Sequence, residues 1–210
     1  MKSRYSVFVI IVFLSFAWSR EIYSGNDIDI ERIQGVWFLT FGVDYWSWNV
    51  LWKCHIIAPF NVTDNRMNLG TYNFFKNKSK APLSVIDEVK RDSQGQFWMK
   101  GPNEKIWENL DTKLFGNKRK PISNMEHPSQ EEPWFFTSPH FYATDYFTFI
   151  STLMIMDDDR KLFQIYTRNP TINDGDISEF TTLAVEQGVD PTTLTTFGCG
   201  DLNPSEFMSA

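Results

Sequence analysis

Acidic side chains in the second half of the chain are the first candidates for chemistry. Asp145 lies in the turn-like stretch "ATDYF", and three aspartates follow one another in "MDDDRK". A carboxyl group inside an apolar cavity holds its proton more tightly and can act as a general acid. Asp145 is the best placed for this role, with the alternative that it only fixes its turn. The run 157–159 lacks the glycine and the spaced oxygen ligands of a calcium loop, so we interpret it as a solvated turn.

The histidines show no metal-ligand spacing. His55, His127 and His140 lie far from one another, and none is spaced from a cysteine as in a zinc site. His55 follows Cys54 in a strand-like segment, so alternation directs the two side chains to opposite faces. We expect His55 to be either a hydrogen-bonded core residue or a group that meets a ligand such as haem. With no serine-type triad and no phosphate-binding glycine loop, the sequence predicts no catalytic residue and no metal site.

The N-terminus and the cysteines indicate the secretory pathway. A basic start precedes the apolar run 7–18, and "AWS" offers small residues for cleavage, which is typical of a signal peptide over residues 1–19. The run is too short to span a bilayer comfortably, although a membrane anchor is the alternative. In that compartment the only two cysteines, Cys54 and Cys199, are expected to form one disulfide, against two separate buried thiols.

Charge and glycosylation signals point to the same compartment. The formal net charge is −6 and no basic face is apparent, which argues against a nucleic-acid partner. Asn61 and Asn77 begin sequons for N-glycosylation. After the leader no apolar run reaches membrane-spanning length, so we expect no transmembrane segment in the mature chain. Secretion into the medium or a body fluid, or delivery to a vacuolar lumen, fits equally well.

The elements that would position these residues are mostly strands in one domain, residues 20–210. Short segments rich in aromatic and β-branched residues alternate with turn signals, which is typical of a barrel or a sandwich. The expected strands lie near residues 36–43, 51–62, 68–75, 83–90, 96–100, 105–110, 134–143, 146–156 and 161–167. The polar stretch 111–132 is interpreted as a long loop, functional or mobile, and a candidate contact for an oligomer or partner.

One helix is expected after the last strand. The stretch "DISEFTTLAVEQG" begins with a capping box of Asp176 and Glu179 and ends at Gly188, which suits a left-handed C-terminal position. Its apolar stripe predicts packing of one face on the outside of the sheet. The stripe consists of Ile177, Phe180, Leu183 and Ala184.

Three separated motifs share an order and spacing that suggest a family. Gly35 and Trp37 open the first strand, "TDY" (Thr144, Asp145 and Tyr146) forms a late turn, and a lone Arg168 follows the last strand. This set resembles the signature of the lipocalin family, in the calycin superfamily, over about residues 30–202. The resemblance implies an all-β fold, an eight-stranded antiparallel up-and-down barrel with one C-terminal helix outside it.

The resemblance also implies structural roles for the motif residues. Trp37 would plug the barrel floor, with Gly35 allowing a tight entry and Arg168 covering the indole through a cation–π contact. Cys54 and Cys199 would tether the C-terminal tail to the barrel wall, as in the family. The stretches "LWKCHIIAPF" and "TRNP" are particularly similar to apolipoprotein D and its relatives.

A second resemblance introduces an enzymatic alternative. "IERIQGVWF", "IYTRNPT" and "TTFGCG" are similar to the lipocalin domain of violaxanthin de-epoxidase, which reduces a carotenoid epoxide with ascorbate. The cysteine-rich region and the acidic tail of that enzyme are missing here, so we lean towards a protein that is not an enzyme. An oxidoreductase of the de-epoxidase type remains the alternative, with Asp145 as its acid.

Aromatic residues suit an apolar cavity, since 16% of the chain is Phe, Trp or Tyr. The main hypothesis is therefore transport or binding of a small hydrophobic ligand, such as a lipid, retinoid, carotenoid or tetrapyrrole, without a fixed cofactor. The third hypothesis is an interaction protein with a self-filled barrel that forms a homo-oligomer or binds a partner. Alternation from the motifs predicts these cavity-lining residues: Leu39, Phe41, His55, Ile57, Trp98, Phe136, Tyr142, Phe149 and Tyr166.

Overall fold

Eight consecutive strands form the wall of a barrel in the computed structural model, which describes residues 20–44, 52–76, 83–100, 139–156 and 159–200. Their aromatic and β-branched residues favour a pleated, half-buried surface. The wall strands are β2 Trp37–Val43, β3 Trp52–Thr63, β4 Arg66–Phe75, β5 Leu83–Arg91, β6 Phe97–Lys100, β7 His140–Thr144, β8 Phe149–Ile155 and β9 Lys161–Thr167. Two short strands, β1 Tyr23–Ser24 and β10 Leu194–Thr196, pair with β7 and β2.

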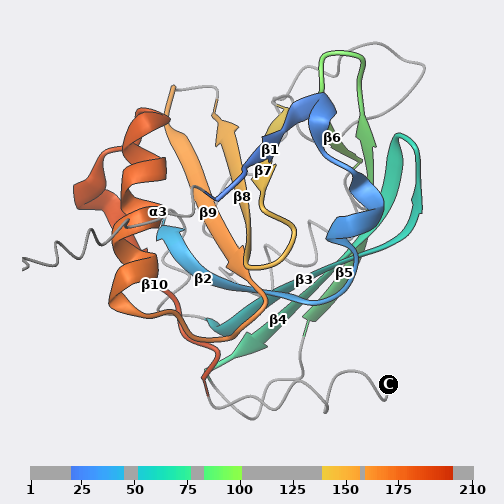
Figure 1. The fold of residues 1–210 in the computed structure, drawn as a ribbon. Helices are drawn as coiled ribbons and strands as arrows, with labels where there is room; N and C mark the ends of the chain where they lie inside the picture. The colour runs from blue at the N-terminus through green and yellow to red at the C-terminus, as the bar shows by residue number, and fades with distance from the viewer. Residues whose placement is uncertain (1–19, 45–51, 77–82, 101–138, 157–158, 201–210) are drawn as a thin grey trace, which may run out of the picture.

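The wall closes on itself in simple up-and-down order (Figure 1). Each strand pairs antiparallel with the next, and β9 returns to pair with β2. The β6–β7 junction is the narrowest, with the single register pair Phe97–His140. The predicted fold class, an eight-stranded antiparallel barrel with one helix outside, is confirmed.

The described strands lie close to the predicted ranges. The main difference is β8, which begins at Phe149 rather than Tyr146 because the residues before it form a turn held by Asp145. The predicted strand 105–110, the predicted loop 111–132 and the leader 1–19 lie outside the described residues.

One α-helix, α3 Asp174–Glu186, packs outside the barrel beside β9, as Figure 1 shows. Its capping box is formed by Asn173 and Asp176, so the predicted box of Asp176 and Glu179 is wrong by one turn. Asn173 lies outside the regular helix and can turn its side chain back to the free N–H groups. The left-handed Gly188 is confirmed, with φ of +72°, and ends the helix.

Buried side chains form two main layers, separated by the barrel wall. The inner cluster fills the barrel and consists of Ile28, Ile30, Ile33, Trp37, Leu39, Ile57, Met67, Leu69, Val89, Phe97, Tyr142, Tyr146, Ile150 and Tyr166. The outer cluster lies between the wall and α3 and consists of Phe41, Phe149, Leu153, Phe163, Ile165, Phe180, Ala184 and Val189. In the helix, Phe180 and Ala184 are buried and Ile177 and Leu183 pack beside them, so the predicted stripe is confirmed.

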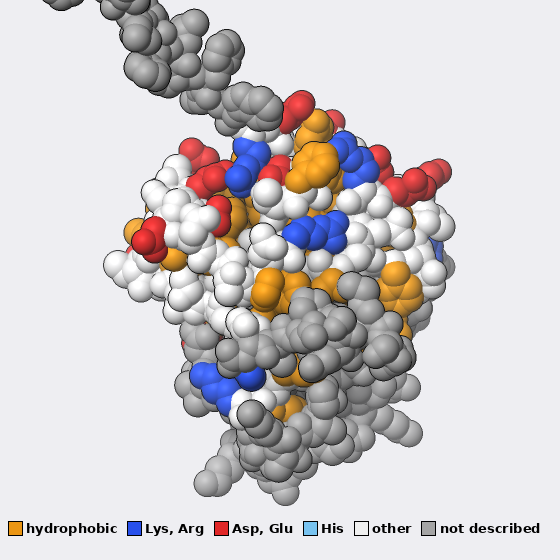
Figure 2. Space-filling view, turned by 60° about the horizontal axis from the view of Figure 1, so that its bottom comes forward, with side chains coloured by type: hydrophobic (Ala, Val, Ile, Leu, Met, Phe, Trp, Pro, Cys, Tyr) orange, Lys and Arg blue, Asp and Glu red, His pale blue; other side chains and the backbone are white. Residues whose placement is uncertain are grey.

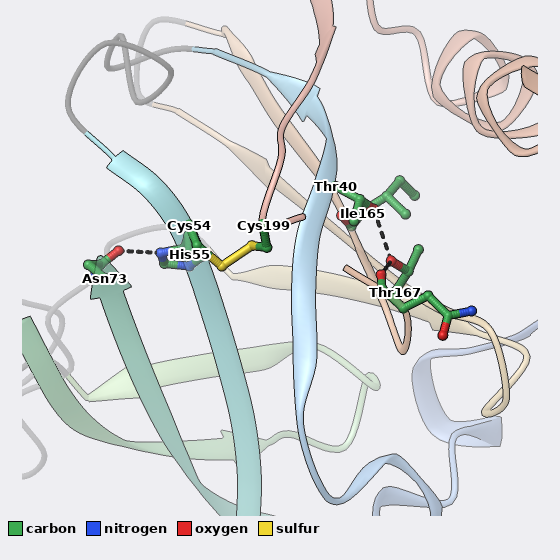
Figure 3. The surroundings of a disulfide bond; sticks show 8 residues. Thr40, Cys54, His55, Asn73, Ile165, Thr167 and Cys199 are labelled. Atoms are coloured by element: carbon green, nitrogen blue, oxygen red, sulfur yellow. Dashed lines mark hydrogen bonds between the residues drawn. A yellow bond between two sulfur atoms is a disulfide. The ribbon is translucent and has the colours of Figure 1, made fainter. Parts of the chain in front are cut away.

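A disulfide joins the barrel wall to the segment after β10. Cys54 of β3 and Cys199 are bonded, 145 residues apart in sequence, so the predicted pairing is confirmed (Figure 3). Both are buried beside Phe38 and Ile56, outside the inner cluster. In the chain-entropy model, closing so long a loop stabilises the fold by about 5 kcal/mol.

Candidate functional site

The barrel floor is closed by Trp37. This side chain is fully buried, its indole N–H donates to the carbonyl of Ile33 at 2.7 Å, and the Arg168 guanidinium lies 3.5 Å from its ring centre. Arg168 also donates to the carbonyls of Gln34 and Val36. Gly35 has φ of +100°, and a Cβ there would lie 3.0 Å from Arg168, so glycine suits the position on both counts.

The "TDY" turn completes the floor. The Asp145 carboxylate accepts hydrogen bonds from the backbone N–H groups of residues 147–149 and from the hydroxyl of Thr148, and it pairs with Arg20 at 3.4 Å. Tyr146 is left-handed, with φ of +68°, and its hydroxyl joins the backbone of Asp27 and Asp29. The carboxylate that the sequence offered as an acid is thus engaged in its own turn.

Above the floor the barrel interior combines apolar and aromatic side chains with a few buried polar ones. Leu39, Ile57, Tyr142 and Tyr166, four of the predicted lining residues, belong to the inner cluster. His55 faces the same interior, since its Nε2 lies 3.2 Å from the Tyr166 hydroxyl. The structure therefore brings five of the predicted residues together from strands β2, β3, β7 and β9.

His55 is held in a hydrogen-bonded chain across three strands. Its Nδ1 lies 2.5 Å from Oδ1 of Asn73 on β4, and Figure 3 shows the ring directed to Asn73, away from the disulfide. The Tyr166 hydroxyl also lies 3.0 Å from Oε1 of Gln164. Burial lowers the pKa of His55 to about 4, so the imidazole is neutral at pH 7. At the end of this series of hydrogen-bonded side chains, Nε2 of Gln164 is buried and has no hydrogen-bond partner among the described residues.

Asp87 of β5 is the residue that the sequence reasoning missed. It is 7% exposed, and its Oδ1 has no hydrogen-bond partner. Burial raises its pKa to about 7, and burial together with the charge of Asp87 raises the pKa of Tyr142. The sequence does contain a signal for Asp87, because every second residue of a strand shares a face. In "LSVIDEVK" Asp87 alternates with Leu83, Val85 and Val89, so one carboxyl group interrupts an apolar series.

Phe41 and Phe149 do not line the cavity, so these two predictions are wrong. Both belong to the outer cluster and contact Phe180 of α3, with ring centres 6.3 and 5.4 Å apart. The cause for Phe41 is a register shift, because Leu39 pairs with Tyr166 but Phe41 pairs with its neighbour Ile165. One extra residue in β2 reverses the alternation.

Phe149 is wrong for a simpler reason. It is the first residue of β8, and Ile150 is the residue that enters the inner cluster. Trp98 is also wrong, because its neighbours Phe97 and Met99 pack on the inner cluster while its own indole donates to Asp92 at 2.8 Å. The alternation was assigned one residue out of phase in both strands.

The remaining predictions concern surface or undescribed positions. Asn61 is exposed on β3, whereas Phe136 and Asn77 lie outside the described residues. Among the described residues no group of His, Cys, Asp or Glu is arranged to hold a metal ion, and no described helix is long and apolar enough to cross a membrane. On the face in Figure 2, basic side chains are scattered among acidic, apolar and neutral ones.

Comparison with known proteins identifies relatives by structure only. No protein-family model matches the chain, and neither does any curated protein. Apocrustacyanin C1 is similar over 85% of this chain and 84% of its own, with a TM-score of 0.59 and 12% identity. Lobster apocrustacyanin A1 is similar over 84% of this chain and 83% of its own, with a TM-score of 0.56 and 10% identity. The cockroach allergen Per a 4 is similar over 81% of this chain and 88% of its own, with a TM-score of 0.54 and 11% identity.

These likenesses establish the fold and nothing finer. Crustacyanins are lipocalins, so the barrel is of the lipocalin type, as the sequence motifs predicted. Identities this low give no information about the ligand.

Proposed function

We propose that this lipocalin-type barrel binds a small, largely apolar molecule in its interior, as a carrier or binding protein. The observation that carries the proposal is the inner wall above the floor, where Asp87 and Gln164 each keep one buried polar atom without a partner among the described residues. An unpaired buried polar group costs roughly 1–3 kcal/mol, and native proteins keep few of them. A ligand that supplies the missing hydrogen bonds would offset that cost.

The surroundings of these atoms set the general nature of the ligand. Leucine, isoleucine and tyrosine side chains of the inner cluster provide most of the wall, so most of the ligand should be apolar or aromatic. Few polar groups are available, so they would fix the orientation of the ligand and contact only a small part of it.

The wider setting stays part of the proposal. A disulfide fits an oxidising compartment, so we propose secretion with removal of the leader and glycosylation at Asn61 and Asn77. The kinship with apolipoprotein D or the de-epoxidase domain is likewise proposed on sequence stretches alone. Nothing favours the de-epoxidase chemistry, because the proposed acid Asp145 is bound within its own turn.

A matched pair of substitutions on β8 tests the proposal. Thr152 pairs with Tyr142 and Gln164 and therefore faces the interior, whereas Ile155 pairs with Lys161 on the outer face and is 39% exposed. We expect the uncharged fluorophore N-phenyl-1-naphthylamine to bind saturably, with an affinity that falls at least about tenfold in Thr152→Phe because the ring fills the site. Ile155→Phe, at an exposed position on the outer face, should bind it as the native protein does.

Circular dichroism would verify that both variants keep the barrel. Absence of saturable binding by the native, disulfide-bonded protein contradicts the proposal, as does equal loss of binding in both variants.

A further inference from the structure

The carboxyl group of Asp87 lies inside the barrel among apolar neighbours. On the adjacent strand it pairs with Leu69, and on its own strand Val89 faces the same interior, with exposed fractions of 3% and 1%. The side chain is 7% exposed, and its Oδ1 is buried without a hydrogen-bond partner among the described residues. An isolated carboxylate is costly in such a place unless a positive charge or several donors accompany it.

Its neighbour in sequence shows what a satisfied carboxylate looks like in this protein. Glu88 points to the outer face, where Oε1 accepts a hydrogen bond from Arg66 at 2.7 Å. Asp87 has no such pairing, since no described arginine, lysine or ammonium group forms an ion pair with it. The two consecutive acids therefore differ in one respect: the outer one has its cation and the inner one does not.

The other titratable groups of the interior do not supply that charge. His55 is neutral and bound to Asn73 and Tyr166, and burial likewise lowers the pKa of His140, next to Tyr142, to about 4. The Tyr142 hydroxyl is uncharged because burial and the charge of Asp87 raise its pKa. Arg91, at the end of the same strand, donates instead to the carbonyls of Ile28 and Asp64. Within the described part of the chain, no group supplies a positive charge to Asp87.

We propose that the barrel recognises an organic cation, an amine on an apolar body whose ammonium group donates to Oδ1 of Asp87. This inference rests on the proposed function and specifies the ligand class. The tyrosine rings of the inner cluster add favourable cation–π surroundings. Charge-assisted hydrogen bonds are about twice as strong as neutral ones, so an amine gains more here than an alcohol of equal size.

The same carboxyl group makes amine binding sensitive to pH. Burial raises the pKa of free Asp87 to about 7, so below neutral pH a proton occupies the group that the ammonium needs. Alkyl amines stay protonated up to about pH 10, as lysine does. Affinity for the amine should therefore rise between pH 5.5 and pH 8, while affinity for the alcohol should stay level.

Displacement of bound N-phenyl-1-naphthylamine by decylamine, decanol and decanoate tests this, below their micellar concentrations. At pH 8 we expect decylamine to displace the fluorophore at a concentration roughly ten times lower than decanol, the factor given by a charge-assisted bond of about 1.4 kcal/mol. Decanoate should be the weakest, because its carboxylate would face that of Asp87. The preference for the amine should disappear at pH 5.5.

Two variants assign the effect to the inner carboxyl. Asp87→Asn removes its charge and should abolish the preference while still binding the fluorophore; Asp87→Leu serves the same purpose with an apolar side chain. Glu88→Gln removes the charge next to it on the outer face and should leave the preference unchanged.

This inference is overturned if decanol or decanoate binds as tightly as decylamine, or if the preference for the amine survives in both Asp87 variants. In either case, binding of the fluorophore by the native protein leaves the proposed function standing. If the native protein does not bind the fluorophore at all, the proposed function and this inference both fall.

Discussion

The barrel floor and the barrel middle both contain buried polar groups but differ in how these groups are satisfied. At the floor, Trp37, Asp145 and Arg168 each have protein partners for their polar atoms. In the middle, Asp87 and Gln164 each retain a buried polar atom that no described residue contacts by a hydrogen bond. Polar groups that bond one another stabilise a fold, whereas groups left incomplete mark the place where another molecule would complete them.

Removing the Trp37 side chain is the strongest way to break the floor. Trp37→Ala should lower the free energy of unfolding by about 3–5 kcal/mol, because it leaves a large cavity and removes the ring under Arg168. Chemical denaturation with the disulfide intact measures this. Trp37→Phe keeps an aromatic ring and should recover part of the loss. A loss below about 1 kcal/mol in Trp37→Ala would contradict the view that the floor is the structural part of the barrel.

Removing the charge of Asp87 should raise the free energy of unfolding at neutral pH, whereas removing the Trp37 side chain lowers it. In the folded state its pKa is raised from 3.8 to about 7, so the folded protein binds this proton more tightly than the unfolded chain does. Stability from this group is therefore full below pH 4 and is lost as the pH rises towards 7.

The stability gained by Asp87→Asn should accordingly grow with pH. Between pH 5 and pH 8 we expect the difference in unfolding free energy between variant and native protein to increase by about 2–3 kcal/mol, or about 1.4 kcal/mol for each pH unit up to the folded pKa. Denaturation of both proteins across this range measures the increase. An equal difference at both pH values would mean that Asp87 is not held in an unfavourable charged state.

The buried His55 changes stability with pH in the direction opposite to Asp87, which sharpens this test. Burial lowers its pKa from 6.5 to about 4, so its neutral form stabilises the fold above pH 6.5 and this stability is lost as the pH falls towards 4. The two groups oppose each other between about pH 4 and pH 6.5. In Asp87→Asn the histidine effect is no longer opposed, so stability should fall more steeply on acidification than in the native protein.

The smallest expected effect is at Trp98, which lies outside both regions. Trp98→Phe removes the hydrogen bond to Asp92 and should cost about 1 kcal/mol, without changing binding of N-phenyl-1-naphthylamine. Denaturation and fluorophore titration measure the two effects. Weaker fluorophore binding in this variant would show that Trp98 contacts the interior after all.

Phase within each strand was the weak point of the sequence reasoning. The rule that alternate residues share a face predicts a lining position correctly only when the starting residue is correct and no bulge intervenes. Leu39 and Tyr166 were predicted correctly because they lie close to the motif residues Trp37 and Arg168. Phe41 lies only two residues beyond Leu39, yet the register shift between them reverses its direction.

The sequence by itself determined the barrel, its helix and its disulfide, because each rests on local patterns or on motifs with a fixed order. Gly35, Trp37 and Arg168 meet at the floor as their motif implied. Only the tertiary structure decided that Asp87 lacks a partner, since pairing depends on side chains from strands far apart in sequence. A residue's type shows that it can bear a charge, but only its neighbours in space decide whether that charge is satisfied.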